Sequence, residues 1–91
     1  MKHNYSFVET LNYIKSTAPK YEFRKPIRLD AYMSEIMPIQ SGSFKFGLVM
    51  NYLHDIQTHF GIRLEHRKNL HIETVRDLVI AVHKLSHDKI K

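Results

Sequence analysis

Cysteine is absent from the sequence, which excludes every function that depends on a thiol of the chain itself. The chain can form no disulfide, no thiolate nucleophile and no thiolate metal site. It also lacks an apolar run approaching the roughly 20 residues that span a bilayer. Residues 1–10 mix charged and aromatic side chains and do not resemble a signal peptide. These absences predict a cytoplasmic protein with no membrane partner.

The motifs of the common enzyme classes are missing as well. The sequence contains no paired-carboxylate motif, no glycine-rich phosphate loop and no nucleophile elbow. His54 and Asp55 are neighbours on a predicted helix and point in different directions, so they do not form an acid–base pair. We therefore predict that the chain is not an enzyme and has no catalytic residue.

Histidine is frequent, with seven in the sequence, and raises the question of a metal site. His83 and His87 are four residues apart, so they share a face of a predicted helix. Two imidazoles without a third histidine or a nearby carboxylate do not complete a typical site. We predict no bound metal.

Length and composition predict one folded domain. The 91 residues and a hydrophobic content of 43% fit a single domain over residues 1–91, with its core at about 6–86. The formal net charge of +5 suggests an acidic partner surface, an anionic ligand or a nucleic acid. No run of five or more like charges occurs, so the chain has no basic tail.

Capping signals and hydrophobic periodicity predict the helices. Ser6 and Glu9 form a capping box that opens a helix over about 6–17, which ends before Pro19. Residues 18–42 form a long connection that is too apolar for a free linker, and we expect it to be attached to the core with one helical turn near 30–36.

A second helix is predicted to begin at Ser43 as N-cap and to end at Phe60, with Gly61 as the C-terminal cap. Its apolar stripe includes Phe46 in the first turn. A short helix is expected around His66–Leu70. A last helix over 74–86 opens on Thr74 and Asp77, and its tail at 87–91 is expected to fray. The prediction is an all-α fold, a small four-helix bundle with a long loop between the first two helices.

Two motifs in the second half resemble the acyl carrier protein family. Phe60-Gly61-Ile62 is similar to the exit of that family's second helix, and Thr74–Val79 to the start of its last helix. Ser43-Phe44 resembles the Ser-Leu opening of the second helix, whose serine carries 4'-phosphopantetheine through a phosphodiester. The resemblance implies an acyl-carrier-protein-like bundle with phosphopantetheine attached at Ser43.

The same resemblance implies a function and partners. The chain would hold an acyl intermediate on the phosphopantetheine arm and present it to enzymes of fatty acid or polyketide biosynthesis. Its partners would be acyl-transfer or synthase enzymes and a phosphopantetheinyl transferase.

Two alternatives remain open. Aligned on Phe60, the attachment position falls at Phe46, three residues after Ser43, so the chain is alternatively a carrier-like adaptor without the arm. Its partner would then bind the second helix and the Arg63–His71 segment. A third reading is a small basic nucleic-acid-binding protein. This reading uses the basic residues of two loops and two aromatic residues for stacking: Arg24, Lys25, Arg28, Arg63, His66, Arg67, Lys68, His71, Tyr21 and Phe23.

Overall fold

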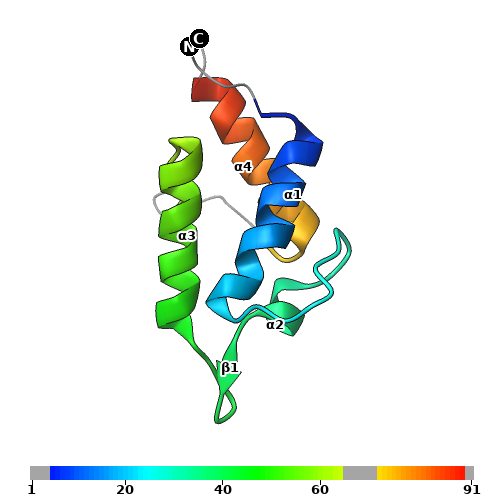
Figure 1. Cartoon of the computed structure of the whole chain (residues 1–91), viewed down its shortest axis with the longest axis vertical. Helices are drawn as coiled ribbons and strands as arrows, with labels where there is room; N and C mark the ends of the chain where they lie inside the picture. Colours follow the sequence, from blue (N-terminus) through cyan, green and yellow to red (C-terminus); the bar gives the residue numbers. More distant parts are fainter. Residues whose placement is uncertain (1–4, 65–71, 90–91) are drawn as a thin grey trace.

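The computed structural model describes residues 5–64 and 72–89. The described part is mostly helical, which confirms the predicted helical class (Figure 1). It also contains a two-stranded antiparallel sheet that the sequence analysis did not predict. The elements follow in the order α1 (Phe7–Thr17), η1 (Ala18–Tyr21), α2 (Met33–Ile36), β1 (Ile39–Gln40), β2 (Ser43–Phe44), α3 (Phe46–Phe60) and α4 (Val75–Lys89).

The helix ends follow the local capping chemistry at three of the predicted positions. Ser6 and Glu9 form the complete capping box of α1, with hydrogen bonds of 2.9 and 3.0 Å. Gly61 ends α3 in the left-handed conformation, at φ 68°. Thr74 and Asp77 exchange reciprocal bonds at the start of α4. These three predictions are therefore confirmed.

The last helix is longer than predicted. α4 continues to Lys89, so the predicted end at residue 86 and the fraying of residues 87–89 are wrong. One contact holds this end of α4 against the N-terminal segment: the His87 ring nitrogen lies 3.1 Å from the carbonyl oxygen of Tyr5. The short helix predicted around residues 66–70 lies outside the described residues.

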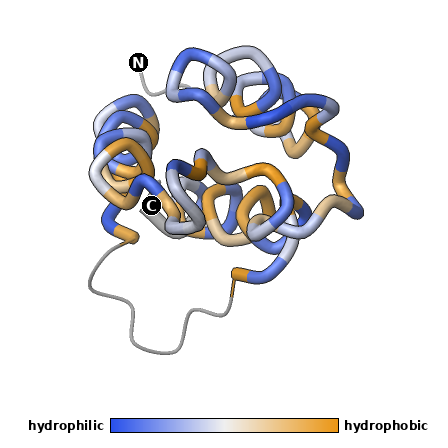
Figure 2. Tube along the Cα trace, turned by 90° about the horizontal axis from the view of Figure 1, so that it is seen from below, coloured by the Kyte–Doolittle hydropathy of each residue, from blue (hydrophilic) through white to orange (hydrophobic). Residues whose placement is uncertain are grey.

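One apolar core connects the long helices with the first loop. α1 packs against α4, and each long helix contains hydrophobic and hydrophilic positions around its circumference (Figure 2). The predicted stripes of α3 and α4 are largely confirmed, but Phe46 is 61% exposed instead of buried. Within the described part of the chain, the buried apolar residues include Ile14, Ala18, Phe23, Ile27, Ile36, Val49, Tyr52, Ile56, Phe60, Ile62, Leu64, Val75, Leu78, Val79, Ala81 and Val82.

Two tyrosine hydroxyls link α1 to α3. The buried Tyr52 hydroxyl donates to the carbonyl oxygen of Ile14 at 3.2 Å and lies 2.8 Å from the Thr17 hydroxyl. The Tyr13 hydroxyl donates to the carboxylate of Asp55 at 3.1 Å. Burial, followed by the effect of Asp55, raises the pKa of Tyr13 to about 12. Burial likewise raises the pKa of Tyr52, so both hydroxyls stay protonated and keep donating at neutral pH.

The long first connection is attached to the start of α4. The amide of Met33 donates to Glu73 O at 2.7 Å, and the amides of Val75 and Arg76 donate to loop carbonyls at 2.9 Å. Ile27 and Ile36 are buried, and α2 falls within the predicted turn region at 30–36. The expectation that this loop is attached to the core is confirmed.

Across residues 5–64 and 72–89, no helix has both the length and the apolar character needed to cross a bilayer.

The carboxylate of Asp77 makes the stability of the fold depend on pH. Backbone hydrogen bonds from Glu73 and Thr74, at 3.0 and 3.1 Å, lower the pKa of Asp77. Because the folded pKa lies below the unfolded value of about 3.9, the ionised carboxylate stabilises the fold above that value. This contribution is lost as the pH falls through the folded pKa. Urea denaturation at a series of acidic pH values should show a shallower loss of unfolding free energy for Asp77→Asn than for the wild type.

Asp30→Asn is the matched control for this measurement. The Asp30 side chain is exposed and has no hydrogen bond to another described residue. It should keep the wild-type dependence on pH. An Asp77→Asn variant with the wild-type slope would contradict the assignment.

Candidate functional site

A tight hairpin precedes α3 and forms one side of the candidate site. Its strands pair Ile39 with Phe44 and Gln40 with Ser43. The two turn residues, Ser41 and Gly42, have φ values of 54° and 80°. Positive φ at both positions is the signature of a type I′ turn, whose twist suits a two-residue hairpin loop.

The prediction of Ser43 as N-cap of the second long helix is wrong. Ser43 lies in β2, and the N-cap of α3 is Lys45, whose side chain makes no capping bond. The physical reason is the hairpin, which continues past the two short strands. The amide of Lys45 donates to Pro38 O at 2.8 Å and keeps Ser43 in extended pairing. The N-cap therefore lies two residues later than predicted, at Lys45, and the helix begins at Phe46.

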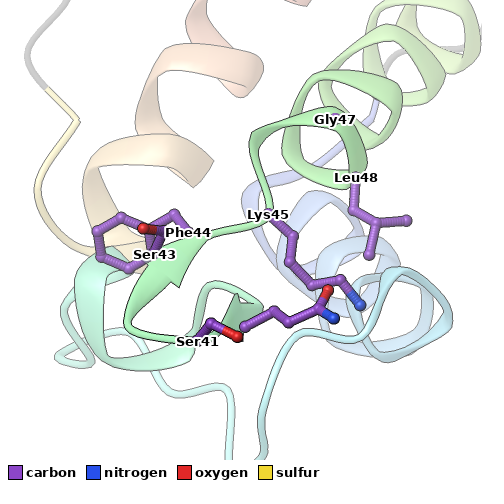
Figure 3. Close-up of a pocket in the computed structure, with 7 residues that line it drawn as sticks. Ser41, Ser43, Phe44, Lys45, Gly47 and Leu48 are labelled. Carbon is purple, nitrogen blue, oxygen red and sulfur yellow. The ribbon is translucent and has the colours of Figure 1, made fainter.

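An open pocket of about 510 Å³ lies between the hairpin and the start of α3 (Figure 3). Ser43 is exposed and lines it, and its hydroxyl makes no hydrogen bond to another described residue. Lys45 and Leu48 both extend outward from the start of α3 (Figure 3). The Lys45 ammonium lies 2.8 Å from Glu22 Oε1, so its charge is already paired. The lining residues are Gln40, Ser41, Ser43, Phe44, Lys45, Gly47 and Leu48.

Beside this pocket lies an apolar ridge, formed by Ile39, Phe44, Phe46 and Met50. The Phe44 and Phe46 rings meet edge-on with centroids 5.8 Å apart, and Ile39 pairs with Phe44 across the hairpin. Met50 follows Phe46 by one helical turn. Ile39, Phe46 and Met50 are 44%, 61% and 49% exposed, and Phe44 is half-buried. Strand pairing, ring contact and helical spacing therefore link these four residues, three of which are exposed to water.

The stacking function predicted for two aromatic residues is wrong for Phe23. Its side chain is buried in the core at 4% exposure and cannot stack on a base. Tyr21 is half-buried, with its ring 5.0 Å from the ring of Tyr52. The side chains of Arg24, Lys25 and Arg28 are exposed, as expected for basic residues of a surface loop. Of the other predicted basic cluster, Arg63 is exposed, and the remaining members lie outside the described residues: His66, Arg67, Lys68 and His71.

The histidine pair on α4 does share a face, as its spacing predicts. The rings of His83 and His87 are 4.2 Å apart, and burial, followed by the neighbouring His87, lowers the pKa of His83. Among the described residues, no three histidine or acidic side chains gather into a potential metal site.

The ridge was missed by the sequence analysis because Phe46 fits the helical period of α3. The sequence nevertheless contains a signal for the hairpin. Ser41-Gly42, a dipeptide that marks turns, stands between short segments that contain Ile39 and Phe44. Recognising the hairpin would have moved the helix start to Phe46 and placed this residue at an exposed end.

No protein-family model, curated protein or solved structure matches this chain.

Two glycines of this site should respond to alanine in opposite directions. At Gly42 the positive φ of 80° strains any residue with a Cβ, and Gly42→Ala should cost about 1 kcal/mol. At Gly47, inside α3, an added Cβ meets nothing within 4 Å. Gly47→Ala should stabilise the protein by about 0.5–1 kcal/mol. Chemical denaturation of both variants measures the difference, and equal effects would contradict the turn geometry.

Proposed function

We propose that the chain is a carrier-protein-like domain that has no phosphopantetheine arm and binds a partner protein through the apolar ridge. The supporting observation is the first residue of α3. The carrier resemblance assigns this position to the attachment serine, and here it is Phe46. Phenylalanine has no hydroxyl to carry a phosphodiester, and its side chain is 61% exposed. An exposed aromatic ring at this position favours docking over covalent attachment.

The continuity of the ridge supports a binding surface. Single exposed apolar side chains are common on proteins, whereas contiguous ones mark interaction sites. The ridge links two hairpin residues to two residues of α3 by ring contact and helical spacing. Aromatic residues and methionine are also the types enriched at protein interfaces. The ridge therefore has both the arrangement and the composition of a docking surface.

The charges near the ridge indicate what kind of partner surface it would bind. The closest cation in sequence, Lys45, is paired with Glu22. The family's second helix is usually acidic and is recognised by basic enzyme surfaces, whereas α3 carries one aspartate, Asp55, whose carboxylate accepts from Tyr13. A partner that relies on charge would gain little here. We expect an apolar partner surface.

Truncation of the ridge tests this function. Phe46→Ala/Met50→Ala should weaken binding by tenfold or more, because burying each side chain contributes about 1.5–3 kcal/mol. The partner is first captured by cross-linking to the wild-type chain in the organism that encodes it. Its affinity for each purified variant is then measured by calorimetry.

Ile80→Ala is the matched control for the ridge variant. Ile80 is 46% exposed on α4, away from the ridge residues in sequence. It should leave the affinity within about twofold of the wild type, since it removes a similar apolar area elsewhere. An equal loss in both variants, or no loss in the ridge variant, would overturn the proposal.

The second candidate function is the carrier with its arm on Ser43. The observation in its favour is that Ser43 is exposed and lines the pocket beside the start of α3. A transferase would reach this hydroxyl without unfolding the hairpin. The α3 N-terminus would contribute partial positive charge near the attached phosphate.

Mass spectrometry separates the two functions. Under the carrier alternative, co-expression with a broad-specificity phosphopantetheinyl transferase adds one phosphopantetheinyl group to the wild type and to Ser41→Ala. Ser43→Ala should then stay unmodified. Under the adaptor proposal all three chains stay unmodified. A modification that survives Ser43→Ala would reject Ser43 as the attachment residue.

A further inference from the structure

A second pocket lies between the end of α1 and the first loop. It has a volume of about 280 Å³ and is lined by Lys15, Lys25, Pro26, Ile27 and Arg28. Three of these five residues are cationic, and no acidic residue lines the pocket. The pocket is distinct from the hairpin pocket, with which it shares no lining residue.

The three cations are unpaired within the described part of the chain. Lys15, Lys25 and Arg28 are exposed, and none makes an ion pair or side-chain hydrogen bond with another described residue. By contrast, Lys45 is paired with the one acidic residue of the segment 15–28, Glu22. Cations that surround a hollow without a counter-charge repel one another, and a bound anion relieves that repulsion.

Net charge is concentrated in this part of the chain. Residues 15–28 contain five basic residues and one acidic residue, which makes +4 of the total charge of +5. A local excess of this kind raises the concentration of anions near the pocket. Most of the net positive charge of the chain therefore lies in residues 15–28, the segment that lines the pocket.

The backbone around the pocket is held in place by the core. Ile27 forms part of the pocket wall and is 4% exposed. On one side of it, the amide of Arg24 donates to Ile36 O at 2.8 Å. On the other side, the amide of Ala31 donates to Arg28 O at 3.0 Å. A pocket on a tethered loop requires little ordering when its ligand binds.

We propose that the pocket formed by Lys15, Lys25 and Arg28 binds a phosphate group. Arginine supplies a planar fork that matches phosphate oxygens, and lysine supplies a compact charge. Pro26 and Ile27 add an apolar wall against which an organic substituent of the phosphate packs. The phosphate belongs to a small organic phosphate or to a lipid headgroup, which share this chemistry. This site is independent of the ridge and of Ser43.

Titration of the full chain with inorganic pyrophosphate tests the site. Amide NMR spectra should show saturable shifts at Lys15 and across residues 25–28. Sodium chloride at equal ionic strength should not reproduce them, because screening acts on all exposed charges. Lys15→Gln/Arg28→Gln should weaken pyrophosphate binding by about tenfold or more, since it removes two charge-assisted contacts. Shifts spread over all basic residues, or none, would overturn the proposal.

Arg63→Gln/Lys84→Gln is the control with the same loss of charge. Both residues are exposed and neither lines the pocket, so this variant should bind pyrophosphate within about twofold of the wild type. An equal loss in both double variants would show that net charge alone attracts the anion, and would also overturn the site.

Flotation with vesicles distinguishes the two sources of phosphate. Phosphatidylcholine vesicles with and without phosphatidic acid are mixed with the wild type and with Lys15→Gln/Arg28→Gln. Flotation that requires both phosphatidic acid and the intact pocket assigns the phosphate to a lipid headgroup. Pyrophosphate binding without flotation assigns it to a small organic phosphate. Flotation that the pocket variant leaves unchanged would reject the lipid headgroup as the ligand of this pocket.

Discussion

Hydrogen bonds between the first loop and the beginning of α4 are the constraint on which the arrangement of the surface depends. The first amides of a helix have no partner within the helix and must be satisfied from outside. Here Val75 and Arg76 donate to Ala31 O and Leu29 O, and the loop amide of Met33 donates back to Glu73 O. These bonds order a long connection that would otherwise lose much conformational entropy on folding.

Both proposed binding surfaces depend on this connection. The phosphate pocket lies where the loop leaves η1, and the ridge lies where the hairpin after α2 joins α3. The long helices α1, α3 and α4 bury the core and hold the two ends of the connection. Such a division, with binding residues on loops above a rigid scaffold, is common in proteins.

The two surfaces differ in charge, and one ion pair contributes to the difference. Glu22 follows η1, and its carboxylate reaches Lys45 at the start of α3. This contact removes the charge from the hairpin side, where an apolar partner is proposed. The same contact pairs the carboxylate of Glu22, the one acidic residue among residues 15–28, with a cation outside that segment. Residues 39–44 carry no charged side chain, so the pairing of Lys45 leaves the hairpin side without an unpaired cation.

Local chemistry explains what the sequence could predict. The caps at Ser6, Gly61 and Thr74 and the apolar stripes of the helices depend on residues within about four positions of one another, so pattern analysis found them. The prediction that Ser43 is a helix N-cap was wrong, because a serine before an apolar run suits a hairpin equally well. The pairing of Lys45 with Pro38 O decided between them, and it joins residues seven apart.

The sequence by itself determined a single, mostly helical chain without cysteine, and the start of α1, the end of α3 and the start of α4. Only the tertiary structure decided that Phe23 is buried and Phe46 exposed. It also decided that Lys15 joins Lys25 and Arg28 around one pocket. The physical reason is that burial and charge clustering depend on segments far apart in the chain, whose approach no local pattern encodes.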